Sequence, residues 1–176
     1  LGMLKREAVE YHKNNNFSKA SNIYNDIIRI YPNDFDSLHM LGVIAAQTSR
    51  FDEAVSLITK ALAINPKSPL AFFHRAKVNI ELKRFKDAIG DYKRALDLNP
   101  MYHEACLALG NTFAKMARPE DAISFFQKAI DLKDDLAEAY YHIGNCYLTL
   151  ADYEAAVRSY DNAIHHFPEY SEAFNN

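Results

Sequence analysis

The sequence predicts an all-α fold in which antiparallel helix pairs stack on copies of themselves. The first observation is a strict period, because alanine recurs every 34 residues, at Ala20, Ala54, Ala88, Ala122 and Ala156. The second is that apolar residues within a period follow helical spacing in two separate stretches. The third is that Asn-Pro pairs stand at the ends of periods. A fixed period of this length indicates one small unit repeated along the chain.

Counting from Leu1 gives frames of 34 residues, and a position shared by all frames is called a column here. The frames cover 1–34, 35–68, 69–102, 103–136 and 137–170, and 171–176 begin a sixth. Column 8 holds only small residues: Ala8, Gly42, Ala76, Gly110 and Gly144. Column 24 holds large ones: Tyr24, Ile58, Tyr92, Phe126 and Tyr160. Small residues let two helix backbones approach closely, and large ones fill the remaining space.

Each frame contains two expected helices, and frame 35–68 shows the pattern most clearly. Leu38, Leu41 and Ala45 form one apolar stripe of a first helix. A second stripe over 54–62 indicates a second helix. The polar stretch 48–50 between them is short enough only for a tight turn, so the two helices are antiparallel neighbours.

The expected limits of the second helices follow from their end residues. Ser18, Asp52 and Asp121 stand just inside the second helices, where they suit the positive end of a helix. The pairs Asn65-Pro66 and Asn99-Pro100 stop these helices, because the residue before proline is disfavoured in helical geometry.

At these residues the chain resembles a tetratricopeptide-repeat (TPR) array. The family pattern appears in "LHMLGVIA…FDEAVSLITKALAINP" over 38–66 and again in "YYHIGNCY…YEAAVRSYDNAIHHFP" over 140–168. The resemblance covers nearly all of the chain and implies one TPR domain over 1–176. It further implies a right-handed superhelical solenoid whose first helices line a concave groove and whose second helices face outward.

Several residues depart from the family pattern. Glu7 and Arg75 replace the usual leucine of their column, Pro119 replaces an aromatic residue, and His166 replaces an aliphatic one. No frame has the usual glycine at the turn between its helices, where the residues are Asn15, Ser49, Lys83, Ala117 and Ala151. We expect these departures to loosen single repeats without changing the fold.

The resemblance also places candidate binding residues on the inward positions of the first helices. These candidates are Lys5, His39, Phe73, His74, Lys77, Leu107, Asn111, Tyr141, His142 and Asn145. Such a mixed lining suits an extended peptide, with asparagine side chains pairing its backbone and Phe73 and Tyr141 supplying contact area. The alternative is that Phe73 and Leu107 only pack between neighbouring first helices.

Two more specific kinds of partner are disfavoured by the charges. Chaperone-binding TPR domains grip a terminal carboxylate with clustered cations, and no window of three repeats here supplies enough of them. The chain has a net charge of −3. Because it lacks a basic stripe with stacking aromatics, we expect no nucleic-acid binding. Residues 1–102 are net basic and 103–176 net acidic, which favours an asymmetric partner or contacts between copies.

Compartment and chemistry follow from what the sequence lacks. Its apolar runs are too short to span a membrane. Its two cysteines, Cys106 and Cys146, make no disulfide framework and suit a reducing, cytoplasmic location. The sequence has no phosphate loop and no zinc motif, so we expect no catalytic, cofactor or metal site and no enzyme activity in this chain.

The function predicted is a non-catalytic scaffold that presents a groove to a peptide or protein segment. The alternative is a substrate-recognition arm of a larger glycosyltransferase, because 17–66 resembles the TPR regions of O-GlcNAc transferase-like bacterial proteins. The start of a sixth repeat at 171–176 suggests an excerpt of a longer protein, with an uncapped end through which copies associate.

Overall fold

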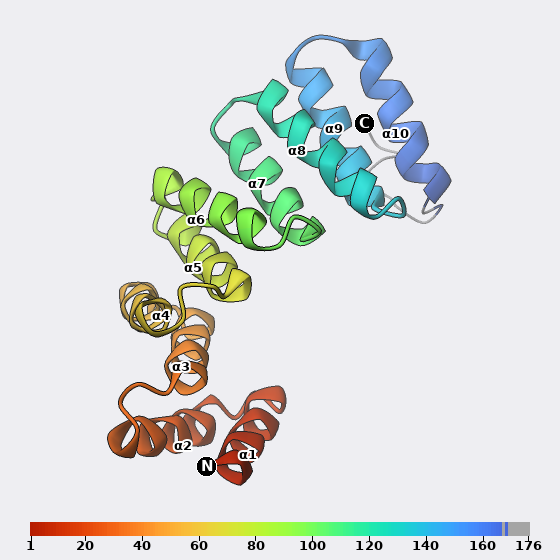
Figure 1. Ribbon diagram of the computed structural model, residues 1–176. Helices are drawn as coiled ribbons and strands as arrows, with labels where there is room; N and C mark the ends of the chain where they lie inside the picture. Colours follow the sequence, from red (N-terminus) through yellow and green to blue (C-terminus); the bar gives the residue numbers. More distant parts are fainter. Residues whose placement is uncertain (167, 169–176) are drawn as a thin grey trace. The chain divides into compact units, whose positions relative to one another are not determined.

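The computed structural model describes residues 1–166 and 168, and within these it contains ten α-helices and no strand. Contacts group the helices into two compact units, unit 1 over Leu1–Leu98 and unit 2 over Asn99–Asn176. The predicted all-α fold of antiparallel helix pairs is confirmed, with each pair visible as two adjacent rods in Figure 1. The expected sixth repeat over 171–176 and its associating end lie outside the described residues.

Unit 1 holds three helix pairs. Its first helices are α1 (Gly2–Lys13), α3 (Phe35–Gln47) and α5 (Pro69–Glu81), and its second helices are α2 (Phe17–Ile30), α4 (Phe51–Ile64) and α6 (Phe85–Leu98). Each first helix packs on the second helix that follows it. The helices α2 and α4 also contact the first helix of the next pair.

Unit 2 holds two helix pairs of the same kind. They are α7 (His103–Lys115) with α8 (Pro119–Leu132), and α9 (Ala137–Thr149) with α10 (Tyr153–His166). The helix α8 packs between α7 and α9. Every helix in the described part of the chain is too short or too polar to cross a lipid bilayer.

The small residues of column 8 allow the close contact within each pair. A Cβ atom on Gly110 would lie 2.7 Å from the ring of Phe126, and one on Gly144 would lie 2.5 Å from the ring of Tyr160. Ala8 and Ala76, which replace glycine in this column, have no exposed surface. The large side chain of column 24 therefore lies directly over column 8, which confirms the steric role predicted for both columns.

The turn between the helices of each pair needs a left-handed residue, although the sequence never supplies glycine there. Asn15, Ser49, Lys83, Ala117 and Ala151 have φ between 54° and 60°. The next residue donates its backbone N–H back to the first helix, as in Arg50 to Ala45 at 2.8 Å and Asp152 to Tyr147 at 2.9 Å. These bonds define a Schellman motif, so the helix-ending hydrogen bonds persist without glycine.

The departure at Arg75 is explained by a partner on the neighbouring second helix. Its guanidinium forms two hydrogen bonds with the Asp91 carboxylate, at 2.8 and 2.7 Å, and a third with Thr59 at 3.0 Å. Asp91 also differs from the apolar residues of its column, Ile23, Leu57 and Phe125; the last frame has Ser159 there. The Arg75 and Asp91 side chains are only 20% and 10% exposed. An ion pair thus stands where frames 35–68 and 103–136 have two apolar residues, and with Thr59 it ties α4, α5 and α6 together.

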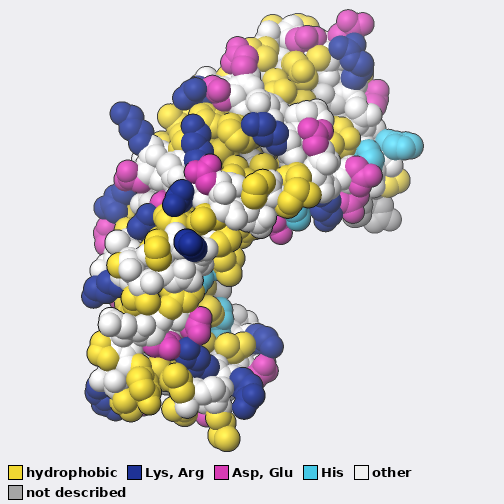
Figure 2. Space-filling model, viewed as in Figure 1, with side chains coloured by type: hydrophobic (Ala, Val, Ile, Leu, Met, Phe, Trp, Pro, Cys, Tyr) yellow, Lys and Arg dark blue, Asp and Glu magenta, His cyan; other side chains and the backbone are white. Residues whose placement is uncertain are grey.

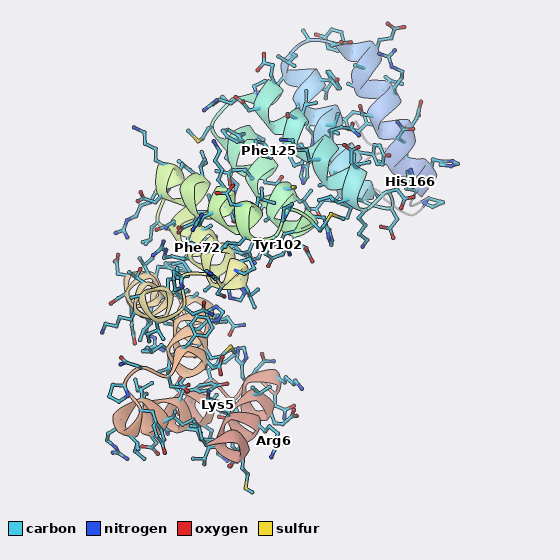
Figure 3. All side chains as sticks on the ribbon, in the orientation of Figure 1. Lys5, Arg6, Phe72, Tyr102, Phe125 and His166 are labelled. Atoms are coloured by element: carbon cyan, nitrogen blue, oxygen red, sulfur yellow. The ribbon has the colours of Figure 1, made fainter. Side chains whose placement is uncertain are left out.

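Two further departures, Pro119 and His166, also fit their surroundings. Pro119 is the first residue of α8, where proline costs no hydrogen bond and its fixed φ favours the helix. His166 stacks on Tyr140 with ring centroids 5.0 Å apart, so an aromatic contact replaces an aliphatic one. His166 is labelled in Figure 3 at the end of α10.

Candidate functional site

All ten candidate residues lie on first helices, and the structure divides them between the two units. Lys5, His39, Phe73, His74 and Lys77 belong to unit 1. Leu107, Asn111, Tyr141, His142 and Asn145 belong to unit 2. In each unit, the side that its first helices present (α1, α3 and α5 in unit 1, α7 and α9 in unit 2) is called the first-helix face of that unit.

A pocket of about 410 Å³ lies between α3 and α5, and we call it the unit 1 pocket. It contains two of the candidates, His74 and Lys77. The sequence analysis missed most of the rest of its lining, which is Val43, Ala46, Gln47, Phe51, Ile58, Val78 and Glu81. Apolar side chains dominate, and Lys77 and Glu81 supply opposite charges.

His74 and His39 form a hydrogen-bonded pair between α5 and α3. The Nε2 atom of His39 lies 2.9 Å from the Nδ1 atom of His74. His39 is only 5% exposed, so it contacts His74 from the interior of the protein and does not line the pocket. Burial lowers the pKa of both rings, and for His74 the nearby His39 and Lys77 lower the pKa further, to about 4. Both imidazoles are therefore neutral at pH 7.

Lys5 is held by carboxylates at the start of the next helix pair. Its Nζ atom lies 2.7 Å from the carboxylates of both Asp34 and Asp36. Burial lowers the pKa of Lys5, but hydrogen bonds to the two aspartates outweigh it and raise the pKa overall. Figure 3 labels Lys5 on α1. This lysine joins the first helix pair to the second, and it does not line the pocket between α3 and α5 described above.

The aromatic candidates pack against the second helix of their own pair. The Phe73 ring lies 5.7 Å from the ring of Tyr92 on α6, and the Tyr141 ring lies 5.8 Å from the ring of Tyr160 on α10. Lys77 Nζ lies 5.8 Å from the centroid of Phe73, a cation–π arrangement. The candidates Phe73, Leu107 and Tyr141 are half-buried, which leaves part of each side chain accessible.

A second pocket, of about 500 Å³, lies between α7 and α9, and we call it the unit 2 pocket. It contains three candidates, Asn111, His142 and Asn145. The residues that the sequence analysis missed are Ala114, Lys115, Ala117, Pro119, Cys146 and Thr149. Its lining is more polar than that of the unit 1 pocket, and its one charged residue is Lys115.

Polar and aromatic neighbours fix the orientation of the unit 2 side chains. The hydroxyl of Tyr160 donates a hydrogen bond of 2.7 Å to the Oδ1 atom of Asn145. The His142 ring stacks on Phe126 at 5.3 Å and lies 3.4 Å from the Glu138 carboxylate. Burial raises the pKa of Cys146 to about 11, so its thiol stays protonated at neutral pH and is a poor nucleophile.

The two pockets occupy the same place in the repeat. Eight of the nine lining residues of one have a counterpart exactly two periods away in the other, as Val43 has Asn111 and Lys77 has Asn145. His74 and His142 also correspond. The signal that could have found the missed residues is this 34-residue spacing, applied to the ends of the first helices and to column 17.

No group of three or more His, Cys, Asp or Glu side chains within residues 1–166 and 168 is arranged to hold a metal ion. Cys106 and Cys146 are both buried and unpaired. Figure 2 shows acidic, basic and hydrophobic side chains interspersed on the visible face of each unit, instead of a patch of one charge.

Comparison with known families identifies the repeat. Two tetratricopeptide repeat models match residues 73–137 and 137–170, which together exceed half of the chain. The model for anaphase-promoting complex, cyclosome, subunit 3 matches residues 13–95. No curated protein sequence matches the chain.

Several solved structures share the fold. A crystal structure of MamA is 22% identical over 94% of this chain and 96% of that chain, with a TM-score of 0.87. MamA from Desulfovibrio magneticus RS-1 is 19% identical over 96% of each chain, with a TM-score of 0.88. YrrB, described as a TPR protein with an unusual peptide-binding site, is 22% identical over 98% of this chain and 89% of that chain, with a TM-score of 0.83.

At these identities the likeness extends to the fold, and it agrees with the solenoid of helix pairs predicted from the sequence. The repeat models, the 34-residue period and the Schellman turns all describe the same unit. The chain belongs to the tetratricopeptide repeat family.

Proposed function

We propose that this protein is a non-catalytic interaction scaffold whose first-helix face binds an extended peptide or protein segment. The observation that carries the proposal is the recurrence of one pocket, at one register, in both units. Membership of the TPR family supports it, as does the likeness to YrrB, which is described as having a peptide-binding site.

The unit 1 pocket suits an apolar side chain of the partner. Val43, Phe51 and Ile58 give it an apolar lining, and burying an apolar side chain there is favourable by roughly 25 cal/mol per Å² of area removed from water. The imidazole of His74 is neutral near pH 7, so it can form a hydrogen bond with the partner without changing its charge in that range. Lys77 and Glu81 line the same pocket, so it can pair with a charged group of either sign beside the apolar one.

The unit 2 pocket suits the peptide backbone or a polar side chain. Asn111 and Asn145 each carry an amide, which can both donate and accept hydrogen bonds. The hydrogen bond from Tyr160 to Asn145 fixes the orientation of one of these amides before a ligand arrives. A fixed side chain loses less entropy on binding, which favours affinity.

The proposed binding set is therefore narrower than the sequence-based candidates. It keeps His74, Lys77, Asn111, His142 and Asn145 as pocket residues. Phe73, Leu107 and Tyr141 are proposed as flanking contact area. His39 and Lys5 are left out, because His39 is buried and Lys5 is bound to two aspartates.

The remaining expectations also stay proposals. We assign no catalytic step to this chain and expect protein partners, not nucleic acid. The unpaired Cys106 and Cys146 support a reducing compartment such as the cytoplasm. The glycosyltransferase-arm alternative has no specific support from the geometry of either pocket, and it predicts a sugar-nucleotide-binding domain in a longer gene product.

The test is selection of displayed 12-residue peptides on the wild-type protein, followed by affinity measurements on variants. Val43→Asn and Asn111→Val exchange the side chains of one column between the two pockets. We expect each exchange to weaken selected peptides by about tenfold or more. Lys86→Ala on α6 is the control outside both pockets. Equal binding by wild type and both exchange variants would refute the proposal.

A further inference from the structure

Unit 1 has a second groove, on the side formed by its second helices. This α2–α4 groove has a volume of about 660 Å³. Ile28 of α2, Leu38 of α3 and Ile64 of α4 contribute apolar lining, together with Pro32 of the turn after α2. Its polar lining is Asn33 and Lys60. It shares no lining residue with the unit 1 pocket.

Large apolar side chains are exposed in and beside this groove. Ile64 is 38% exposed, and next to the groove in sequence Ile30 and Tyr31 are 67% and 51% exposed. Hydrophobic side chains are visible over α2 in Figure 2. Adjacent exposed apolar residues of this size are characteristic of interaction surfaces, whereas single ones are ordinary.

The charge in the groove indicates the chemistry of its occupant. Lys60 is the one charged residue of the lining, and it forms no ion pair within the described part of the chain. The nearby Arg29 is already paired with Asp26 at 2.8 Å. An apolar lining with one unpaired cation at its edge is complementary to an apolar side chain with a carboxylate beside it.

Two features distinguish this groove from the same columns in later frames. The column of Lys60 also holds cations at Arg94 and Lys128. Arg94 lies 3.9 Å from the Asp97 carboxylate and Lys128 lies over the Phe125 ring, whereas Lys60 forms no ion pair within the described residues. Likewise Tyr31 stands where the next two frames have asparagine. Apolar residues and a cation recur one period on, at Leu62, Pro66 and Arg94, so the unpaired lysine and the exposed Tyr31 are what distinguish this groove.

We propose that the α2–α4 groove binds a segment of a partner protein in which an apolar side chain lies next to an aspartate or glutamate. The apolar side chain packs against Ile28, Pro32 and Ile64, and the carboxylate pairs with Lys60. This surface is separate from the first-helix face, so the protein presents two binding surfaces of different chemistry. It goes beyond the proposed function and does not depend on it.

The experiment uses displayed 12-residue peptides selected on the wild-type chain and counter-selected on the Ile64→Ser/Lys60→Glu double variant. We expect the retained peptides to combine an apolar residue with an acidic one within three positions. Ile64→Ser alone should weaken them about tenfold or more. Selection on Lys60→Glu should instead favour basic residues beside the apolar one. Circular dichroism checks that the variants keep the helical fold.

Matched controls remove trivial explanations. Lys86→Glu makes the same charge change in unit 1 outside the groove, and Met3→Ser removes another exposed apolar side chain, on α1. Neither should change peptide affinity. Failure to retain any peptide, or equal binding by wild type and Lys60→Glu, overturns the proposal. Retained peptides that Val43→Asn also fails to bind would belong to the first-helix face and would likewise overturn it.

Discussion

Units 1 and 2 are built from the same repeat but join their helices by different chemistry. In unit 1 the ion pair Arg75–Asp91 and the pair His39–His74 link neighbouring helices. In unit 2, stacked rings occupy two of the corresponding columns. Phe125, which shares the column of Asp91, stacks on Phe113 at 5.5 Å. His142, which shares the column of His74, stacks on Phe126.

The comparison shows that the position of a residue in the repeat and the kind of interaction it makes are determined separately. The register determines which side chains meet, because the columns recur at the same places on each helix pair. It does not determine whether they meet as ions, hydrogen-bonded rings or stacked rings. Since the interactions of unit 1 involve titratable groups, we expect its stability to depend more on charge and pH than that of unit 2.

The largest effect is expected from breaking the ion pair of unit 1. Asp91→Ala leaves the guanidinium of Arg75 partly buried without its carboxylate and should cost about 3 kcal/mol in the free energy of unfolding. The loss should appear in chemical denaturation and as faster hydrogen exchange in α5 and α6. The control is Ser159→Ala in the same column of unit 2, with a cost of about 1 kcal/mol or less.

The double variant Arg75→Leu/Asp91→Leu sharpens this test. It gives both columns apolar residues, as in frames 35–68 and 103–136. Replacing a buried ion pair by packed apolar groups is often neutral or stabilising. We expect it to recover most of the stability lost in Asp91→Ala. If the double variant is as unstable as Asp91→Ala, an apolar contact cannot replace the stabilisation that the ion pair provides.

Acid should destabilise unit 1 through His74. Its pKa is about 4 in the folded protein and 6.5 as an ordinary value, so between these pH values the unfolded chain binds more protons. Stability is thus present above pH 6.5 and is lost as the pH falls toward 4, by up to about 3 kcal/mol. Hydrogen exchange of α3 and α5 between pH 7 and 4 measures it. His74→Asn should flatten this dependence, whereas His142→Asn should leave it in place.

A smaller effect is expected where column 8 meets column 24 in unit 2. In Gly144→Ala the new methyl group would lie 2.5 Å from the Tyr160 ring, and displacing the ring should cost about 1–2 kcal/mol despite the better helix propensity of alanine. Because Tyr160 holds Asn145, peptide affinity should fall as well. Gly90→Ala on α6 is the control, since nothing lies within 4 Å, and it should raise the melting temperature.

Much of the fold, but less of the candidate site, could be predicted from the sequence. The period placed the helix pairs, the close contact of column 8 and the helix ends, because all three are local or periodic properties. It also placed the ten candidates on first helices. It could not show that His39 is covered or that Lys5 binds Asp34 and Asp36, because a column gives a side chain its place and not its partner.

The turns between paired helices keep their usual hydrogen bonds although the sequence lacks the usual glycine. The missing glycine predicts looser single repeats, and this stays a prediction about stability. The left-handed residue and both Schellman hydrogen bonds are present in every turn between paired helices. The backbone bonds need a left-handed φ and do not need glycine itself. The pockets, in contrast, draw on both first helices and column 17, and only the packing of two pairs brings these residues together.

The smallest effect is expected from restoring glycine to the turns of unit 2. Ala117→Gly and Ala151→Gly relieve the strain of a positive φ and should each stabilise the protein by about 0.5 kcal/mol. Thermal melting checks the gain. Ala114→Gly, three residues earlier within α7, should instead lose about 1 kcal/mol, because glycine is unfavourable inside a helix. A loss of stability in both turn variants would contradict the account of the turns.

The most direct test of binding on the first-helix face is amide chemical-shift mapping by NMR. The ligand is the tightest selected peptide that still binds Lys60→Glu. We predict that the largest shifts fall on α3, α5, α7 and α9, at residues lining the unit 1 and unit 2 pockets. Shifts confined to the second helices α2, α4, α6, α8 and α10 would contradict the account.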